Sequence, residues 1–221
     1  MSGYAKRAVA TVIVTVAVLA AIVVYIALYL TNVPGSVAAT RTPLGAQLYL
    51  ATVPAAEATD PHPTWVSFYA VNANSGDWRH KTTYEVPAHT LVRITVYQYD
   101  GPSGLRNPFL SQVAGTVGGA MSLDGKLTRS IDPESASHVF AVPQLGLLVP
   151  LEGVEEEAKN ACEQAPCSLA QAHHTISFVI HTPGKGLYRW QCFVPCAAGF
   201  IQGFGGPMQT VGYMGGFIKV V

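Results

Sequence analysis

The chain has 221 residues, of which 49% are hydrophobic, and its 13 basic and 13 acidic side chains cancel to a formal charge of zero. Only 12% of the residues are charged and no basic stretch stands out, which argues against nucleic acid as a partner. The sequence has no serine nucleophile elbow, phosphate-binding glycine loop or paired carboxylates, so independent hydrolase or transferase chemistry has no support. Its 21 glycines and 15 prolines recur between short apolar runs, which is typical of a β sandwich or barrel.

Residues 8–30 form an apolar segment without a charged residue or a proline. As a helix the segment would extend roughly 35 Å, enough to cross a hydrocarbon core of about 30 Å. A secretory signal peptide is the alternative, but its apolar core is shorter, about 7–15 residues. Lys6 and Arg7 precede the segment and no basic residue follows before Arg41, so the positive-inside rule leaves residues 1–7 in the cytoplasm. We therefore predict a single-pass anchor in the cell membrane, with the remaining chain on the periplasmic or extracellular side.

Residues 31–43 contain Asn, Pro, Gly and Ser without periodicity and are predicted to be a linker. The remainder, 44–221, is long enough for one domain with a sizeable core. Short runs rich in β-branched and aromatic residues predict strands at 47–52, 65–71, 91–99, 138–142, 175–181, 187–192 and 215–221. Strict alternation predicts inward-facing side chains on two of them, which are Val92, Ile94 and Val96, and then Ile176, Phe178 and Ile180.

Two stretches fall outside the predicted strands. Residues 103–126 contain several glycines and are predicted to be a surface loop or insertion. The acidic segment 152–157 leads into Cys162 and Cys167, which we predict to close a small exposed helix by a local disulfide, because the outer compartment permits disulfides. Metal binding by this cysteine pair beside the acidic run is the alternative.

Four residues with soft or borderline donor atoms lie near the ends of predicted strands. Cys192 ends one strand, Cys196 follows on a loop, His138 begins another strand, and Met214 lies just before the last strand. Thiol, imidazole and thioether donors suit copper. Met208 on the same loop is an alternative to Met214, and either methionine could instead be a plain core residue. A redox-active dithiol is disfavoured because thiol oxidoreductases place their cysteines at the start of a helix.

Other histidines and aromatic residues near these positions have simpler interpretations. His173 and His174 begin an alternating strand and are predicted to be structural rather than metal ligands. Tyr188 and Trp190 share a strand face with Cys192, so they either pack in the core or form an apolar wall beside an electron path. We favour core packing for Tyr188.

Three segments resemble a known family: HVFAVPQLGLLVPL from His138, HTISFVIHTPGKGLYRWQCFVPC, and YMGGFIKVV at the C-terminal end. Together they resemble the cupredoxin domain of heme–copper oxidase subunit II, which carries the binuclear Cu A centre, over about residues 86–221 and the anchor. The resemblance implies an all-β Greek-key cupredoxin sandwich with one N-terminal transmembrane helix. It assigns a first histidine ligand, two bridging thiolates and an axial-type methionine, which are His138, Cys192, Cys196 and Met214. The second histidine of the family is missing, because Phe200 stands at its position.

The resemblance predicts a subunit II-like, non-catalytic part of a respiratory terminal oxidase or a related electron-transfer complex. Through a modified copper site it would pass electrons from a soluble donor toward a heme-containing polytopic partner subunit. Three alternatives stay open. One is a copper-free structural subunit, similar to that of quinol oxidases, with a Cys192–Cys196 disulfide. The others are a stand-alone tethered cupredoxin and a zinc or copper-storage site.

Overall fold

A computed structural model describes residues 3–25, 35–57, 64–72, 74–104, 106–195, 206–208 and 210–221. The chain divides into two compact units. In the first, α1 (Gly3–Tyr25) is long and apolar enough to cross a membrane by length and composition. The helix begins earlier than residue 8 because helical backbone continues through the basic flank. Its predicted end, at 26–30, lies outside the described residues.

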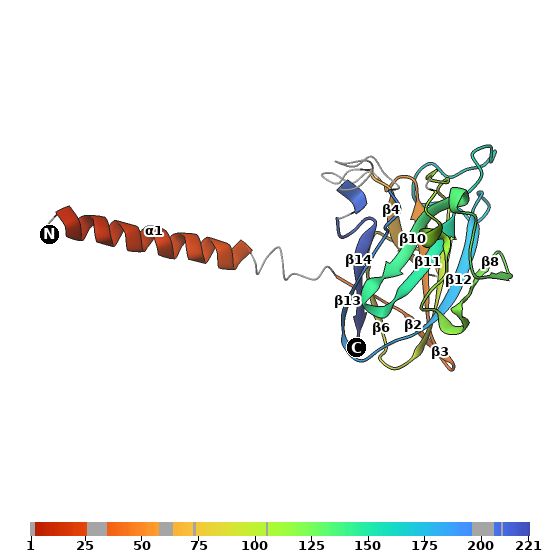
Figure 1. The fold of residues 1–221 in the computed structure, drawn as a ribbon, viewed down its shortest axis with the longest axis horizontal. Coiled ribbons are helices and arrows are strands. Elements are labelled where there is room, and N and C mark those ends of the chain that lie inside the picture. Colours follow the sequence, from red (N-terminus) through yellow and green to blue (C-terminus); the bar gives the residue numbers. More distant parts are fainter. Residues whose placement is uncertain are drawn as a thin grey trace. The chain divides into compact units, whose positions relative to one another are not determined.

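The second unit, Gly35–Val221, is a sandwich of two β-sheets (Figure 1). The six-stranded sheet has the spatial order β1 (Val37–Ala38), β6 (Thr83–Val86), β14 (Gly215–Val220), β13 (Gly186–Gln191), β10 (Ala136–Val142) and β11 (Leu147–Glu152). The eight-stranded sheet has the order β5 (Trp78–Arg79), β4 (Ser67–Val71), β3 (Gly45–Val53), β7 (Leu91–Gln98), β12 (His174–His181), β8 (Met121–Leu123) and β9 (Lys126–Thr128), with β2 (Thr40–Thr42) paired to β3. The predicted all-β sandwich with one N-terminal apolar helix is confirmed.

The core lies between the two sheets and follows from alternation along the strands. The six side chains predicted to face inward from β7 and β12 are all buried, with at most 3% of their surface exposed. From the other sheet, Trp190 of β13 packs between Tyr84 and Phe140, with ring centroids 5.8 and 5.0 Å away. Trp190 is fully buried and Tyr188 packs partly buried against this core, as expected for core aromatics.

The N-terminal boundary of the sandwich differs from the predicted linker, 31–43. β1 pairs in parallel with β6, and β2 pairs with β3, so residues 37–42 belong to the sheets. These strands are two and three residues long and largely exposed, and they carry no apolar periodicity that would mark them in the sequence. The linker prediction was therefore wrong for 37–42.

The predicted loop at 103–126 has more structure than expected. It contains the 3-10 helices η2 (Pro108–Ser111) and η3 (Val117–Gly119) and strand β8, and it buries Leu110 and Met121. Ala114 exchanges two backbone hydrogen bonds with Leu148, so the stretch covers the outer edge of β11. Other short 3-10 helices are η4 (Pro133–Ser135), η5 (Pro143–Leu145) and η6 (Gly206–Met208).

A second hydrophobic cluster lies on the outer face of the eight-stranded sheet. Cys162 and Cys167 form a disulfide and pack there against Tyr69 and Tyr99. The small helix predicted at this disulfide is absent from the described residues 152–173. Two features oppose a helix: Pro166 provides no backbone N–H, and the cysteines turn inward toward the aromatic side chains.

Candidate metal centre

Neighbouring strands bring His138 and Cys192 together. His138 lies in β10, a strand buried along its whole length, and Cys192 follows directly after β13. The two strands pair at Ala141 and Gln191. Both side chains are fully buried, and His138 Nδ1 lies 4.0 Å from Cys192 Sγ. The donor atoms of two ligands that share one metal, with bonds of about 2.0–2.3 Å, lie at a separation similar to this 4.0 Å.

The other nitrogen of His138 is held by Asp100. His138 Nε2 lies 3.0 Å from Asp100 Oδ2, and because a carboxylate only accepts, the imidazole donates through this nitrogen. Asp100 Oδ1 in turn accepts from the backbone N–H of Gly101 at 2.8 Å. With the Nε2 proton fixed in this way, a neutral His138 presents the Nδ1 lone pair toward Cys192. Metal-binding histidines are typically oriented by such a carboxylate.

A buried polar chain fixes Asp100 to the opposite sheet. The side-chain amide of Gln98, the last residue of β7, donates to the Asp100 carbonyl at 3.0 Å, and Thr52 of β3 donates to the Gln98 carbonyl oxygen. Thr52 and Gln98 are both fully buried. The orientation of His138 therefore depends on residues from both sheets.

Two opposing effects act on the pKa of His138. Burial lowers it, because the charged imidazolium loses contact with water, but the hydrogen bonds and charges of Asp100 and Cys192 outweigh burial and raise the pKa from 6.5 to about 9. A metal binding to Nδ1 must displace a proton from this nitrogen below that pH.

The sulfur of Cys192 has a polar environment inside an apolar core. The backbone N–H of Val139 donates to Cys192 Sγ at 3.4 Å, an interaction that favours a thiolate. In its thiol form the same sulfur can donate to the carbonyl of Val194 at 3.7 Å. The next side chain, Phe193, is 37% exposed, so the sulfur lies one residue from the surface.

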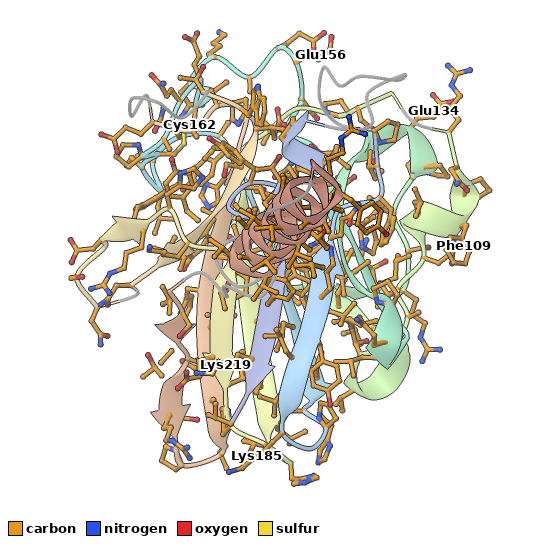
Figure 2. All side chains as sticks on the ribbon, turned by 90° about the vertical axis from the view of Figure 1, so that its left-hand side faces the viewer. Phe109, Glu134, Glu156, Cys162, Lys185 and Lys219 are labelled. Carbon is orange, nitrogen blue, oxygen red and sulfur yellow. A yellow bond between two sulfur atoms is a disulfide. The ribbon has the colours of Figure 1, made fainter. Side chains whose placement is uncertain are left out.

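Phe193 and Ala141 also line an apolar groove of about 600 Å³ beside the buried site. Phe109, 71% exposed, forms another part of its wall. Figure 2 shows Phe109 and Cys162 on opposite sides of the domain. The groove and the disulfide cluster therefore occupy different faces.

The predicted methionines are buried in the same core. The backbone N–H of Cys192 donates to the Met214 carbonyl at 2.9 Å, which places these two residues side by side. Met208, in η6, is also fully buried and belongs to the same hydrophobic cluster as Cys192 and Met214. Cys196 and Phe200 lie outside the described residues. The structure thus brings the His138 imidazole and the Cys192 sulfur together, places the Met214 backbone beside Cys192, and buries both methionines in the same core.

The chemistry of this donor set fits copper better than zinc. Nitrogen, thiolate and thioether donors suit copper, whereas zinc sites usually combine four Cys, His or carboxylate ligands. Across the residues the structure describes, no cluster of three or more His, Cys, Asp and Glu side chains is placed to hold a metal. Asp100 contacts the His138 nitrogen that faces away from Cys192 and therefore orients the imidazole.

The other sequence candidates are structural. The disulfide between Cys162 and Cys167 leaves no thiolate there for a metal. His173 packs against Tyr99 with ring centroids 5.2 Å apart, and His174 Nδ1 donates to Asp124 at the surface. The sequence alone did not identify Asp100 as the partner of His138. A carboxylate at the end of an alternating strand, in a chain poor in charge, was the available signal.

Comparisons with known proteins give only distant similarities. No protein-family model matches the sequence, and no curated protein is similar to it. Similar solved structures include reduced rusticyanin, with 15% identity over 86% of this chain and 87% of that chain and a TM-score of 0.35. Rusticyanin from Thiobacillus ferrooxidans has 15% identity over 86% of this chain and 85% of that one, with a TM-score of 0.34. A chain of a heme–copper terminal oxidase dimer has 13% identity over 99% of both chains and a TM-score of 0.32.

None of these similarities identifies a ligand or a partner of this chain.

Proposed function

We propose that this chain is a membrane-anchored, cupredoxin-like electron-transfer subunit with a modified copper site at Cys192. The observation that carries the proposal is the geometry of His138: Nε2 donates to Asp100 while Nδ1 faces Cys192 Sγ at 4.0 Å. A buried imidazole fixed through one nitrogen, with the other directed at a cysteine sulfur, is suited to hold a metal ion.

Each residue around the site has a distinct part in holding copper. His138 Nδ1 and Cys192 Sγ would be ligands, and Met214 or Met208 would supply a thioether. Asp100 keeps the imidazole in the required orientation and protonation form. A one-electron couple between Cu(I) and Cu(II) is the chemistry that the ion supplies there.

The surroundings of Cys192 suit electron transfer more than substrate chemistry. His138, Cys192 and both methionines are fully buried, so the site excludes water, and a rigid core limits the rearrangement that accompanies a change of oxidation state. Phe193 connects the sulfur to the surface through a single peptide unit and is 37% exposed. Electrons can therefore enter or leave close to Cys192 while the site itself stays closed.

The cellular setting follows from the sequence and from α1. A helix able to span a membrane would hold the sandwich at the outer face of the cell membrane, since the basic residues precede it. The resemblance to oxidase subunit II supports a terminal oxidase or a related complex as the host, with electrons arriving from a soluble donor and leaving toward a heme-containing polytopic subunit. The heme–copper oxidase named among the similar structures is compatible with this host.

Copper content tests the proposal directly. Full-length protein purified from native membranes without chelator is analysed for copper per chain and for a thiolate-to-copper charge-transfer band, alongside Cys192→Ser. We expect copper and the band in the unmodified protein and neither in the variant. Absence of copper, with thiols that react only after reduction, would instead identify a structural subunit with a Cys192–Cys196 disulfide. Stable isolation without any heme-containing subunit would favour the stand-alone cupredoxin.

A further inference from the structure

Thr82, which lies just before β6 and is buried, joins the two segments that carry the sulfur residues of the site. Its hydroxyl oxygen accepts the backbone N–H of Gly212 at 2.8 Å. Its carbonyl accepts the indole N–H of Trp190 at 2.9 Å and the backbone N–H of Phe217 at 3.0 Å. Trp190 lies two residues before Cys192, and Gly212 lies two residues before Met214.

The backbone from Gly212 to Met214 is held by hydrogen bonds along its whole length. All six of its backbone donors and acceptors are hydrogen-bonded. The N–H and carbonyl of Gly212 bond to Thr82 Oγ1 and Ser67 Oγ, respectively. Those of Tyr213 bond to Thr210 O and Phe68 N, and those of Met214 bond to Pro207 O and Cys192 N. Such complete satisfaction is what fixes an irregular segment inside a packed core.

Local geometry gives the Thr82 contact particular weight. Gly212 has φ +107°, a conformation that favours glycine, and its N–H has one other acceptor, Gly215 O at 3.3 Å, which is longer than the contact to Thr82. β14 also passes directly against the Thr82 carbonyl, so closely that a Cβ on Gly216 would overlap it. Removing the hydroxyl would therefore take away the shorter hydrogen bond of the Gly212 N–H while leaving β14 in place.

We propose that Thr82 is a positioning residue of the metal site, whose hydroxyl sets the place of Met214 relative to Cys192 through Gly212. The inference builds on the proposed copper function, because the effect on a metal requires a metal at Cys192. The hydrogen bonds themselves exist in the metal-free protein, so the role of Thr82 in holding the segment can be measured separately.

The chain offers matched variants for this test. Thr82→Val keeps the shape of the side chain and removes the hydroxyl, whereas Thr82→Ser keeps the hydroxyl. Thr182→Val is a control with the same chemical change, since Thr182 is also fully buried and its hydroxyl oxygen accepts the backbone N–H of Thr90 at 2.9 Å. The Thr182 hydroxyl donates to the carbonyls of Pro87 and Thr90, so its bonds lie outside the ligand-bearing segments.

The first measurement uses the metal-free full-length protein in detergent. Backbone hydrogen exchange is followed at Gly212, at Thr90 and across β12. In Thr82→Val we expect exchange at Gly212 to rise about 5- to 10-fold, the range for one lost hydrogen bond, with β12 unchanged. Thr82→Ser should behave as the unmodified protein, and Thr182→Val should raise exchange at Thr90 alone. An equal rise at Gly212 and throughout β12 would show general destabilisation and overturn the assignment.

The second measurement uses the copper-loaded protein. We expect Thr82→Val to shift the charge-transfer band and the reduction potential, whereas Thr82→Ser and Thr182→Val leave both in place. If Thr82→Val had the same charge-transfer band and reduction potential as the unmodified protein, the positioning role would be overturned. It would also be overturned if Thr82→Ser changed both as much as Thr82→Val. If the unmodified protein binds no copper, the copper function fails, and the hydrogen-exchange result still decides whether Thr82 holds the segment.

Discussion

Two histidine–carboxylate pairs in this domain differ in a way that separates a candidate site from a surface contact. His174 Nδ1 lies 2.6 Å from Asp124 Oδ2, and their side chains are 26% and 48% exposed. His138 Nε2 lies 3.0 Å from Asp100 Oδ2, and their side chains are 0% and 21% exposed. The shorter contact is thus the more exposed one.

What distinguishes the pairs is the second ring nitrogen and the surroundings. In His138 this nitrogen faces Cys192 Sγ inside the core, whereas His174 begins β12 and contacts Asp124 in the turn between β8 and β9. A short histidine–carboxylate contact therefore does not by itself indicate a site. Burial of the pair, together with a soft donor atom opposite the remaining ring nitrogen, is the better indication of a candidate metal site.

The largest expected difference between the pairs is in copper content. His138→Ala removes a proposed ligand and should reduce copper affinity by more than about 100-fold, beyond the 10- to 100-fold typical of an orienting residue. His174→Ala should leave copper content unchanged. Elemental analysis of both full-length variants checks this. Full copper in His138→Ala would remove His138 from the site.

The pH dependence of stability should single out the buried pair. Because the pKa of His138 is raised from 6.5 to about 9, the metal-free protein gains stability that is fully present below pH 6.5 and is lost as pH rises through about 9. The loss should be on the order of 3 kcal/mol in the free energy of unfolding. Urea unfolding at a series of pH values from about 6 to about 10 measures this loss.

Asp100→Asn is the matched variant for that pH series, because it keeps the size of Asp100 and removes its charge. The decrease in the free energy of unfolding between pH 6.5 and 9 should be much smaller in this variant than in the unmodified protein. An unchanged decline would mean that Asp100 is not the group that stabilises charged His138.

The two carboxylates should also differ in their effect on copper. Asp100→Asn weakens the orientation of His138 and should lower copper affinity about 10- to 100-fold, as is typical when the partner of a metal-binding histidine is lost. Asp124→Asn should not change it. Competition titrations with a copper chelator compare the two variants. Equal copper affinities of Asp100→Asn and Asp124→Asn would show that Asp100 has no part in orienting His138.

Much of the sandwich could be predicted because alternation in the sequence matches burial in the structure. Val92, Ile94 and Val96 face the core because β7 has one apolar side, and the sequence shows this directly. The short strands β1 and β2 have no such pattern, since they are held mainly by pairing with longer strands. Pairing between distant segments leaves no local signal.

The same distinction applies to the site. His138 and Cys192 could be predicted because donor side chains at strand ends are visible in the sequence. Asp100 could not be assigned to His138, because the contact joins residues 38 positions apart, one in β10 and the other just after β7 of the opposite sheet. Thr82 was equally invisible, since two of its three contacts are made by its backbone carbonyl. Predicting either residue requires the register of the sandwich.

The smallest expected effect concerns the exposed pair. Burial raises the pKa of Asp124, but the hydrogen bonds from His174 and from the backbone of Thr175 outweigh it and lower the pKa below 3.8. The pair therefore stabilises the fold above pH 3.8, and this contribution is lost as pH falls through the lowered pKa. Because both side chains are partly exposed, it should be less than about 1 kcal/mol.

Asp124→Asn isolates this charge. Asp124 has φ +47°, which asparagine also tolerates, and an asparagine oxygen can still accept the Thr175 N–H. The variant should be slightly less stable than the unmodified protein at neutral pH and equal to it in acid, where the aspartate is protonated. Thermal unfolding of both proteins at the two pH values measures the difference. If Asp124→Asn remained less stable than the unmodified protein in acid, the loss of stability would come from the hairpin backbone and not from the charge. The ionic contact of the exposed pair would then contribute nothing to stability.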